Sequence, residues 1–157
     1  MALKKAKISR WIISILTVIV VSQIIHWIGA AVGMKYYMDP NYFDVWSKLM
    51  MPEPGPPPIS FMMYSLLFNL ITSFIFVFVY LLLYDSIPGT KVLNKGFIYG
   101  LIIFIISGVS SALSLTLLMN LPCGLILSWT IEGFIIDITG GMLVAIIVKP
   151  IVEQKIA

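Results

Sequence analysis

The sequence predicts an all-α integral membrane protein: a four-helix bundle, antiparallel up-down-up-down, with a short amphipathic helix in its first outer loop. Four apolar runs of 23 or 24 residues fill most of the 157-residue chain, and the hydrocarbon core of a bilayer needs about 20 helical residues. Charged residues make up 11% of the chain, against about 25% in soluble domains. We expect one transmembrane domain over residues 1–157, with helices at 11–33, 61–84, 97–119 and 125–148.

The placement of basic residues predicts the orientation of these helices. Eight of the ten Lys and Arg residues precede the first run, separate the second from the third, or follow the fourth. If the runs alternate in direction, these eight share one side, and the positive-inside rule makes that side cytoplasmic. We therefore expect a multi-pass protein of the cell membrane with both termini in the cytoplasm. Basic residues beside a first helix serve orientation and lipid contact, so nucleic acid is not an expected partner.

The first run also has features of a cleaved signal peptide. Basic residues precede it, and small residues lie near its end at 29–31. However, the apolar part of a signal peptide is usually about 7–15 residues long, and run 11–33 is longer. We therefore expect a retained helix rather than a removed leader.

The outer loop, residues 34–60, is the largest segment between two runs. Asp39 followed by Pro40 is typical of a helix N-cap and first helical position, and Phe43, Trp46 and Met50 then share one helical stripe. These features predict an amphipathic helix over about residues 40–51, lying at the outer membrane surface.

A proline-rich segment, residues 52–58, follows this predicted helix. Proline fixes φ and removes backbone donors, so the segment is expected to be stiff and extended. It is either a spacer leading into the second helix or a ledge on which a partner docks. We expect the docking residues of the outer loop to be aromatic residues and prolines: Tyr37, Tyr42, Phe43, Trp46, Pro56 and Pro57.

The two remaining loops are shorter. Residues 85–96 contain Pro88 and Gly89, which predict a turn. Residues 120–124 leave so little chain that the third and fourth helices are expected to form a tight antiparallel hairpin.

Five polar residues within the apolar runs form a predicted intramembrane polar seam. Charged groups at the bilayer centre cost roughly 2.5–3.5 kcal/mol on insertion scales, so such residues face inward and usually serve a purpose. All four helices contribute to the polar seam: His26, Asn69, Ser111, Glu132 and Asp137.

Depth along each helix groups these residues into two layers. At 1.5 Å rise per residue, four of them lie about 10–12 Å below the outer surface, which predicts contact between His26 and Glu132. Asp137 lies about 16–18 Å down, at the depth of several hydroxyl groups. We expect it to be surrounded by Ser22, Thr72, Ser73 and Ser107.

The chemistry of the polar seam has more than one reading. Glu132 and Asp137 are either structural groups that fix helix register or titrating groups that handle protons or a cation. His26 is a hydrogen-bonding imidazole, a proton relay or a metal ligand. The chain has one histidine and one cysteine and lacks metal-ligand spacing, so neither a metal nor a cofactor is expected. Methionines near the outer loop give a weak copper alternative.

No catalytic motif is present in the sequence. We therefore expect a non-enzymatic small membrane protein that acts as an accessory or structural subunit of a larger membrane complex. It would dock through its outer loop and a lipid-facing helix onto another membrane protein or a second copy. The alternative is an oligomer that conducts or transports protons or cations along His26, Glu132 and Asp137. A membrane enzyme that uses the polar seam ranks last.

Overall fold

Helices joined by turns and irregular loops make up the part of the chain that the computed structural model describes, residues 2–53 and 57–156. Side chains are described for residues 8–53 and 57–149. This part of the chain contains five α-helices and no β-strand, so the all-α prediction is confirmed. The elements are α1 (Ala2–Tyr37), the 3-10 helix η1 (Pro40–Val45), α2 (Ile59–Leu83), α3 (Val92–Ile103), the π-helical turn η2 (Phe104–Val109), α4 (Ser110–Leu118) and α5 (Cys123–Ile156).

Four helical stretches are long and apolar enough to cross a membrane, as is expected of a multi-pass membrane protein. The third stretch combines α3, η2 and α4 without interruption. The four stretches are Ile8–Tyr37, Ile59–Leu83, Val92–Leu118 and Cys123–Lys149.

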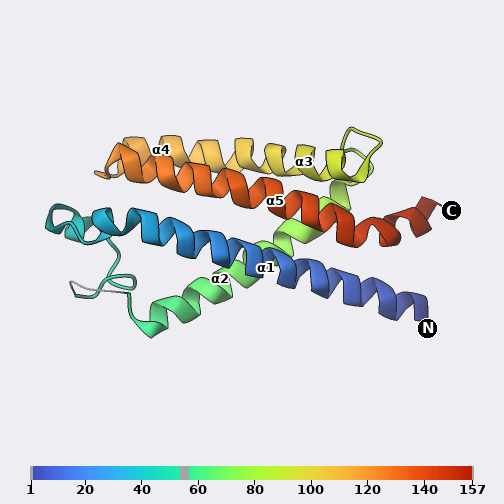
Figure 1. Cartoon of the computed structure of the whole chain (residues 1–157), viewed down its shortest axis with the longest axis horizontal. Helices are drawn as coiled ribbons and strands as arrows, with labels where there is room; N and C mark the ends of the chain where they lie inside the picture. The colour runs from blue at the N-terminus through green and yellow to red at the C-terminus, as the bar shows by residue number, and fades with distance from the viewer. Residues whose placement is uncertain (1, 54–56, 157) are drawn as a thin grey trace.

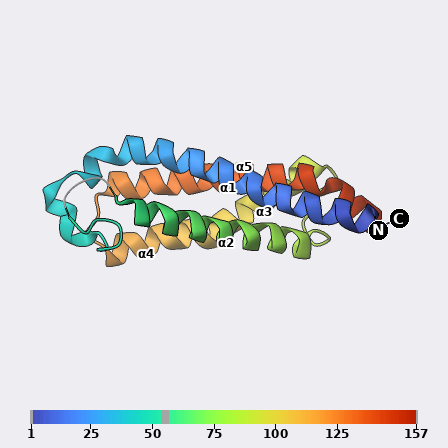
Figure 2. The same ribbon diagram turned by 90° about the horizontal axis from the view of Figure 1, so that it is seen from below.

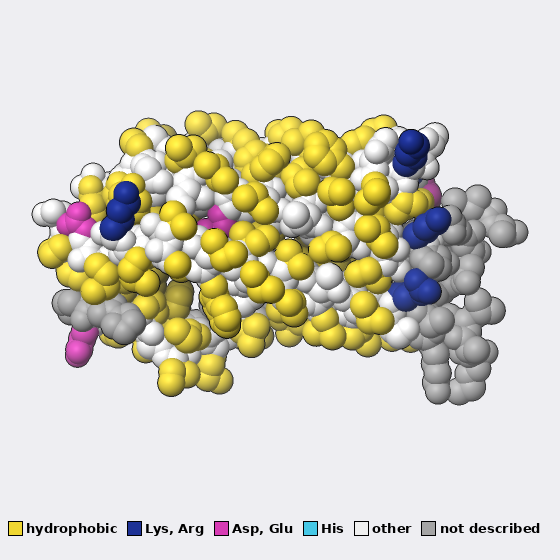
Figure 3. All heavy atoms as spheres, viewed as in Figure 1, with side chains coloured by type: hydrophobic (Ala, Val, Ile, Leu, Met, Phe, Trp, Pro, Cys, Tyr) yellow, Lys and Arg dark blue, Asp and Glu magenta, His cyan; other side chains and the backbone are white. Residues whose placement is uncertain are grey.

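The helices lie along a common long axis, and α5 lies between α1 and the α3–α4 stretch (Figure 1). Both termini lie at one end of the molecule, and the segment between α1 and α2 lies at the other (Figures 1 and 2). In Figure 1, α2 crosses α1 at an angle and diverges from it towards the end that carries η1. Hydrophobic side chains cover most of the face in Figure 3, and most of the Lys and Arg side chains in view lie at the end with the termini.

The closest helix contact joins α3 to α5 through glycines. A Cβ added to Gly96 would lie 2.5 Å from the Gly141 carbonyl oxygen, and one added to Gly141 would lie 3.0 Å from the Gly100 amide nitrogen. Ala145, one turn after Gly141, packs on the same side against Gly96. Small residues spaced by four allow membrane helices to approach closely and gain van der Waals contact. These residues therefore bring the two backbones together.

A buried cluster fills the half of the molecule nearer the termini. Val77, Tyr80, Tyr99 and Val144 are almost completely buried there. The Tyr99 hydroxyl donates a hydrogen bond of 2.6 Å to the Phe76 carbonyl, which ties α3 to α2. This cluster holds the C-terminal half of α2 against α3 and α5.

Basic side chains add further ties at this end. Lys95 donates to the Tyr84 carbonyl at 2.8 Å, and its ammonium group lies 4.3 Å from the centre of the Tyr84 ring. Arg10 donates to the Ile147 carbonyl at 3.2 Å and so joins α1 to α5. Tyr84 is the C-cap residue of α2, and a cation beside the carbonyl groups at the C-terminus of a helix is electrostatically favourable.

The π-helical turn η2 changes which side of the third stretch faces α5. A regular helix that presents Gly96 and Gly100 would next present Ser107, Ser111 and Ser114. A π-helical turn holds more residues per turn than an α-helix. After η2, the positions that face α5 are therefore shifted by one residue along the sequence. From Ser107 to Leu118 the half-buried positions are Gly108, Ala112 and Leu115, whereas Ser107, Ser111 and Ser114 are exposed.

The turn is accompanied by a specific aromatic contact. The Phe104 ring packs edge-on against Phe134 of α5, with ring centres 5.1 Å apart. It also covers Gly108, where an added Cβ would lie 2.5 Å from a Phe104 ring carbon. Gly108 therefore leaves the space that the Phe104 ring occupies.

The outer loop contains a shorter helix than the sequence predicts. Asp39 caps η1 by accepting a hydrogen bond from the Asn41 amide at 3.0 Å, and Pro40 is the first helical residue. The helix ends at Val45 because Trp46 is extended, with φ −76° and ψ 141°. The predicted amphipathic helix over residues 40–51 is therefore replaced by one 3-10 helix and a later turn.

The turn predicted between the second and third helices is present. Gly89 has a φ of +114°, a conformation that L residues with a side chain rarely adopt. It follows Pro88 and precedes α3, which begins at Val92. Glycine is therefore required where the chain reverses at this end.

Substitution of Gly100 by Ala is expected to destabilise the protein by about 1–3 kcal/mol, the usual cost of overpacking. The new Cβ would lie 2.8 Å from the Asp137 carbonyl carbon, a backbone atom that cannot rotate away. Gly133→Ala is the control, because a Cβ there meets nothing within 4 Å. Unfolding in mixed detergent micelles measures both changes. Equal stability of the two variants would show that the glycine contact is unimportant.

Candidate functional site

A contact between the His26 imidazole of α1 and the Glu132 carboxyl group of α5 is the most polar contact inside the spanning stretches. His26 Nδ1 lies against Glu132 Oε1, which confirms the pairing predicted from depth. The His26 side chain is 53% exposed, whereas that of Glu132 is 11% exposed. Glu132 is therefore shielded by the helices, and His26 is the member of the pair that a ligand can reach.

Gly29 makes the space for the Glu132 carboxyl group. A Cβ at Gly29 would lie 2.6 Å from Glu132 Cδ. Gly29 follows His26 by three residues, so both lie on the same side of α1. The glycine and the histidine together form a notch that receives the acid.

Asn69 connects α2 to α1 through a cluster of hydrogen bonds. Its amide nitrogen donates to Gln23 Oε1 at 3.2 Å and to the Ile19 carbonyl at 3.4 Å. Its carbonyl oxygen accepts from Ser22 at 3.0 Å and from Ser73 at 3.2 Å. Both serines are buried. Asn69 thus uses its donors and acceptors within the protein, which is the pattern of a structural tie between helices.

The inner layer predicted around Asp137 does not form. Ser22 and Ser73 bond to Asn69, while Ser107 donates to the Ile103 carbonyl of its own helix. Among the described residues, none of these hydroxyls bonds to Asp137, which is half-buried on α5. The hydroxyls instead find partners in their own helix or at Asn69.

Ser111 is also apart from the other residues of the polar seam. It lies on α4 after the π-helical turn and is exposed. The structure therefore brings together His26 with Glu132, and Asn69 with its neighbours on α1, but it leaves Ser111 and Asp137 outside these contacts.

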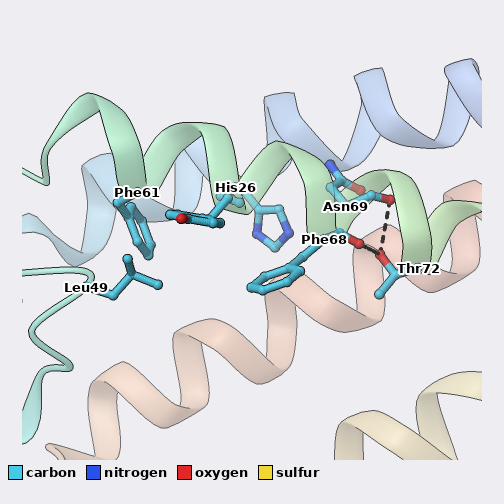
Figure 4. A pocket seen from close by; sticks show the side chains of 8 residues that line it. His26, Leu49, Phe61, Phe68, Asn69 and Thr72 are labelled. Atoms are coloured by element: carbon cyan, nitrogen blue, oxygen red, sulfur yellow. Dashed lines mark hydrogen bonds between the residues drawn. The ribbon is translucent and has the colours of Figure 1, made fainter.

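A pocket of about 290 Å³ opens beside His26, between α1, α2 and the outer loop. Its labelled side chains run from Phe61 and Leu49, past His26 and Phe68, to Asn69 and Thr72 (Figure 4). It exists because α2 is tied to α1 at Asn69 and diverges towards its N-terminal end (Figure 1).

The sequence assigns His26, Asn69 and Thr72 to polar layers, but it does not predict that they line a pocket with Phe61 and Phe68. Phe61, Ser65, Phe68 and Thr72 recur every three or four residues, so they share one side of α2. This periodicity was the available signal, but in a membrane helix such a stripe is equally compatible with lipid contact.

The outer-loop residues predicted to bind a partner make internal contacts in part. Trp129 donates to the Tyr37 hydroxyl at 2.8 Å, and the Trp46 ring lies 5.2 Å from the Tyr37 ring and 6.2 Å from that of Trp129. These three rings fasten the loop to α1 and α5. Tyr42, Phe43 and Pro57 are half-buried. Pro56 lies outside the described residues.

Comparisons with protein families, curated proteins and solved structures give no significant match to this chain. In the described part of the chain, no three His, Cys, Asp or Glu residues are grouped so that they could hold a metal ion. A functional proposal for this chain therefore rests on its own structure.

Replacing Asn69 with Leu is expected to lower the free energy of unfolding by about 2–2.5 kcal/mol. Single polar contacts in membrane proteins contribute about 0.6 kcal/mol on average, and Asn69 makes four. Thr72→Val is the matched control on the same helix, since Thr72 bonds only to backbone carbonyls of α2. Denaturation in mixed micelles compares the two. A Thr72→Val loss as large as that of Asn69→Leu would contradict the assignment of Asn69 as the tie between helices.

Proposed function

We propose that the chain is a non-enzymatic, multi-pass protein of the cell membrane that acts as an accessory or structural subunit of a larger membrane complex. Its four spanning stretches would run antiparallel, with both termini in the cytoplasm. The partner is another membrane protein or a second copy of the chain. The orientation and the docking surface are supported by separate observations.

The orientation is supported by charge. Arg10, Lys91, Lys95 and Lys149 belong to the end of the molecule that carries the termini. The acidic residues of the outer loop belong to the other end, and they are Asp39, Asp44 and Glu53. Basic residues stay preferentially on the cytoplasmic side of spanning helices.

The single cysteine of the chain tests this orientation. Cys123 is exposed at the start of α5, so a membrane-impermeant maleimide added to intact cells should label it. In a Cys123→Ser background, Thr90→Cys places a thiol in the loop between α2 and α3 and should react only after permeabilisation. Labelling of Thr90→Cys in intact cells would invert the proposed topology.

One observation carries the docking proposal: the outward row of serines on the third stretch. Ser107, Ser111 and Ser114 are exposed, while the adjacent residues Gly108 and Ala112 are half-buried. Small polar residues at this spacing favour close packing against another helix. A row of them on the outer side of a spanning helix therefore suits a partner helix better than acyl chains.

The outer loop extends the same docking surface. It lies at the end of the molecule where α4 also ends (Figure 1). Tyr37 and Trp46 hold it in place, which leaves Tyr42 and Phe43 as the aromatic residues available to a partner outside the membrane. A rigidly held loop loses less conformational entropy on binding than a flexible one.

Proton or cation transport is the second candidate, and the His26–Glu132 pair beside a pocket favours it. A path along the predicted polar seam would also have to include Asp137. That residue does not line the pocket, whose polar residues are His26, Ser65, Asn69 and Thr72, together with the Tyr64 hydroxyl. Docking is therefore the better-supported function.

Site-specific cross-linking tests the docking proposal. A photoreactive amino acid at position 111 should give one discrete protein adduct in native membranes, and mass spectrometry identifies its second chain. Position 131 on α5 is the control, because Ile131 is a comparably exposed apolar residue. Replacing both Ser107 and Ser114 by Ile should abolish the adduct by blocking close approach. Adducts with lipid alone at position 111 would refute this docking surface.

A further inference from the structure

We propose that the pocket between α1 and α2 binds a small, uncharged, lipid-soluble ring compound whose hydroxyl or carbonyl oxygen hydrogen-bonds to His26. This site is made by α1, α2 and the outer loop. It shares no residue with the serine row on α4, so it adds a ligand to the proposed docking function and does not depend on it.

The position of the pocket determines how a ligand reaches it. It lies within the stretches that are apolar enough to span a membrane. The two helices that form the pocket also carry large exposed apolar side chains, among them Met62, Leu66 and Trp27. A molecule already dissolved in the lipid phase can enter between α1 and α2, whereas an ion would first have to lose its hydration.

The polar end of the ligand is determined by the His26–Glu132 pair. Glu132 engages Nδ1, which orients the ring, and Nε2 has no hydrogen-bond partner among the described residues. A neutral imidazole accepts a hydrogen bond at this nitrogen, and a protonated one donates. A hydroxyl group suits both states, and a carbonyl oxygen suits the protonated state. An uncharged ligand can hydrogen-bond to Nε2 without adding a charge beside Glu132.

The walls of the pocket determine the body of the ligand. Phe61, Tyr64 and Phe68 supply three aromatic rings, which favour offset or edge-on contact with a planar ring. The volume of about 290 Å³ is at the lower end of the roughly 300–1,000 Å³ of small-molecule sites. It accommodates one or two fused rings, and a phospholipid headgroup with two chains would not fit.

The only histidine of the chain makes the test direct. Protein labelled with ¹⁵N-histidine is purified in detergent and titrated with 1-naphthol, and NMR follows both ring nitrogens. We expect the Nε2 resonance to shift and the Nδ1 resonance, held by Glu132, to change little. Naphthalene partitions into the same micelles but has no hydroxyl. It should bind at least about tenfold more weakly, because it leaves Nε2 unpaired.

A filling variant and its matched control distinguish binding in the pocket from partitioning of naphthol into the micelle. Thr72→Phe fills the pocket and should abolish the naphthol shift. Thr116→Phe is the control, because Thr116 is also exposed and donates to the carbonyl four residues earlier, but it lies on α4 away from the pocket. Ser65→Leu is a second filling variant, used if the Nδ1 resonance of Thr72→Phe shows that the His26–Glu132 contact is disturbed. A shift that survives both filling variants, an equal response to naphthalene, or no response to naphthol would overturn the proposal.

Discussion

The backbone contact between α3 and α5 determines how the rest of the molecule is arranged. Lipid removes most of the hydrophobic drive that packs helices in water, so close approach and van der Waals contact must replace it. Gly96, Gly100 and Gly141 allow this approach and thereby fix the rotation of α5. Glu132 precedes Gly141 by nine residues, about half a turn round the helix. The side of α5 that meets α3 is therefore nearly opposite the side that presents Glu132 to His26.

The second helix is held by different forces, and this difference creates the pocket. Its C-terminal half is fixed by the buried aromatic cluster, where the Tyr99 hydroxyl donates to the Phe76 carbonyl. Its middle is fixed by Asn69, which bonds to α1. Its first turns, which include Phe61, have no comparable contact to α1 or α5 among the described residues. A helix tied at two points along one half diverges over the other half, and the space beside His26 follows.

Much of the fold was predictable because hydropathy and the rise per residue are local properties. Run lengths predicted the four stretches, and depth alone predicted the His26–Glu132 contact. Ser111 was misplaced because one π-helical turn moves every later residue to a new side, and that turn accompanies the contact between Phe104 and Phe134. The loop helix stops early for a similar reason, since Trp46 packs with Trp129, far away in the sequence. Contacts between distant segments leave no trace in local periodicity.

The two acids of α5 show how position on one helix separates two roles. Glu132 lies over Gly29 and contacts His26, and His26 lines the pocket. The backbone of Asp137 packs against Gly100 of α3. No hydroxyl group of the described residues links Asp137 to the His26–Glu132 pair. A chain of proton carriers needs neighbours within hydrogen-bond reach at each step. The gap between these acids therefore separates the His26–Glu132 pair from the glycine contact between α3 and α5.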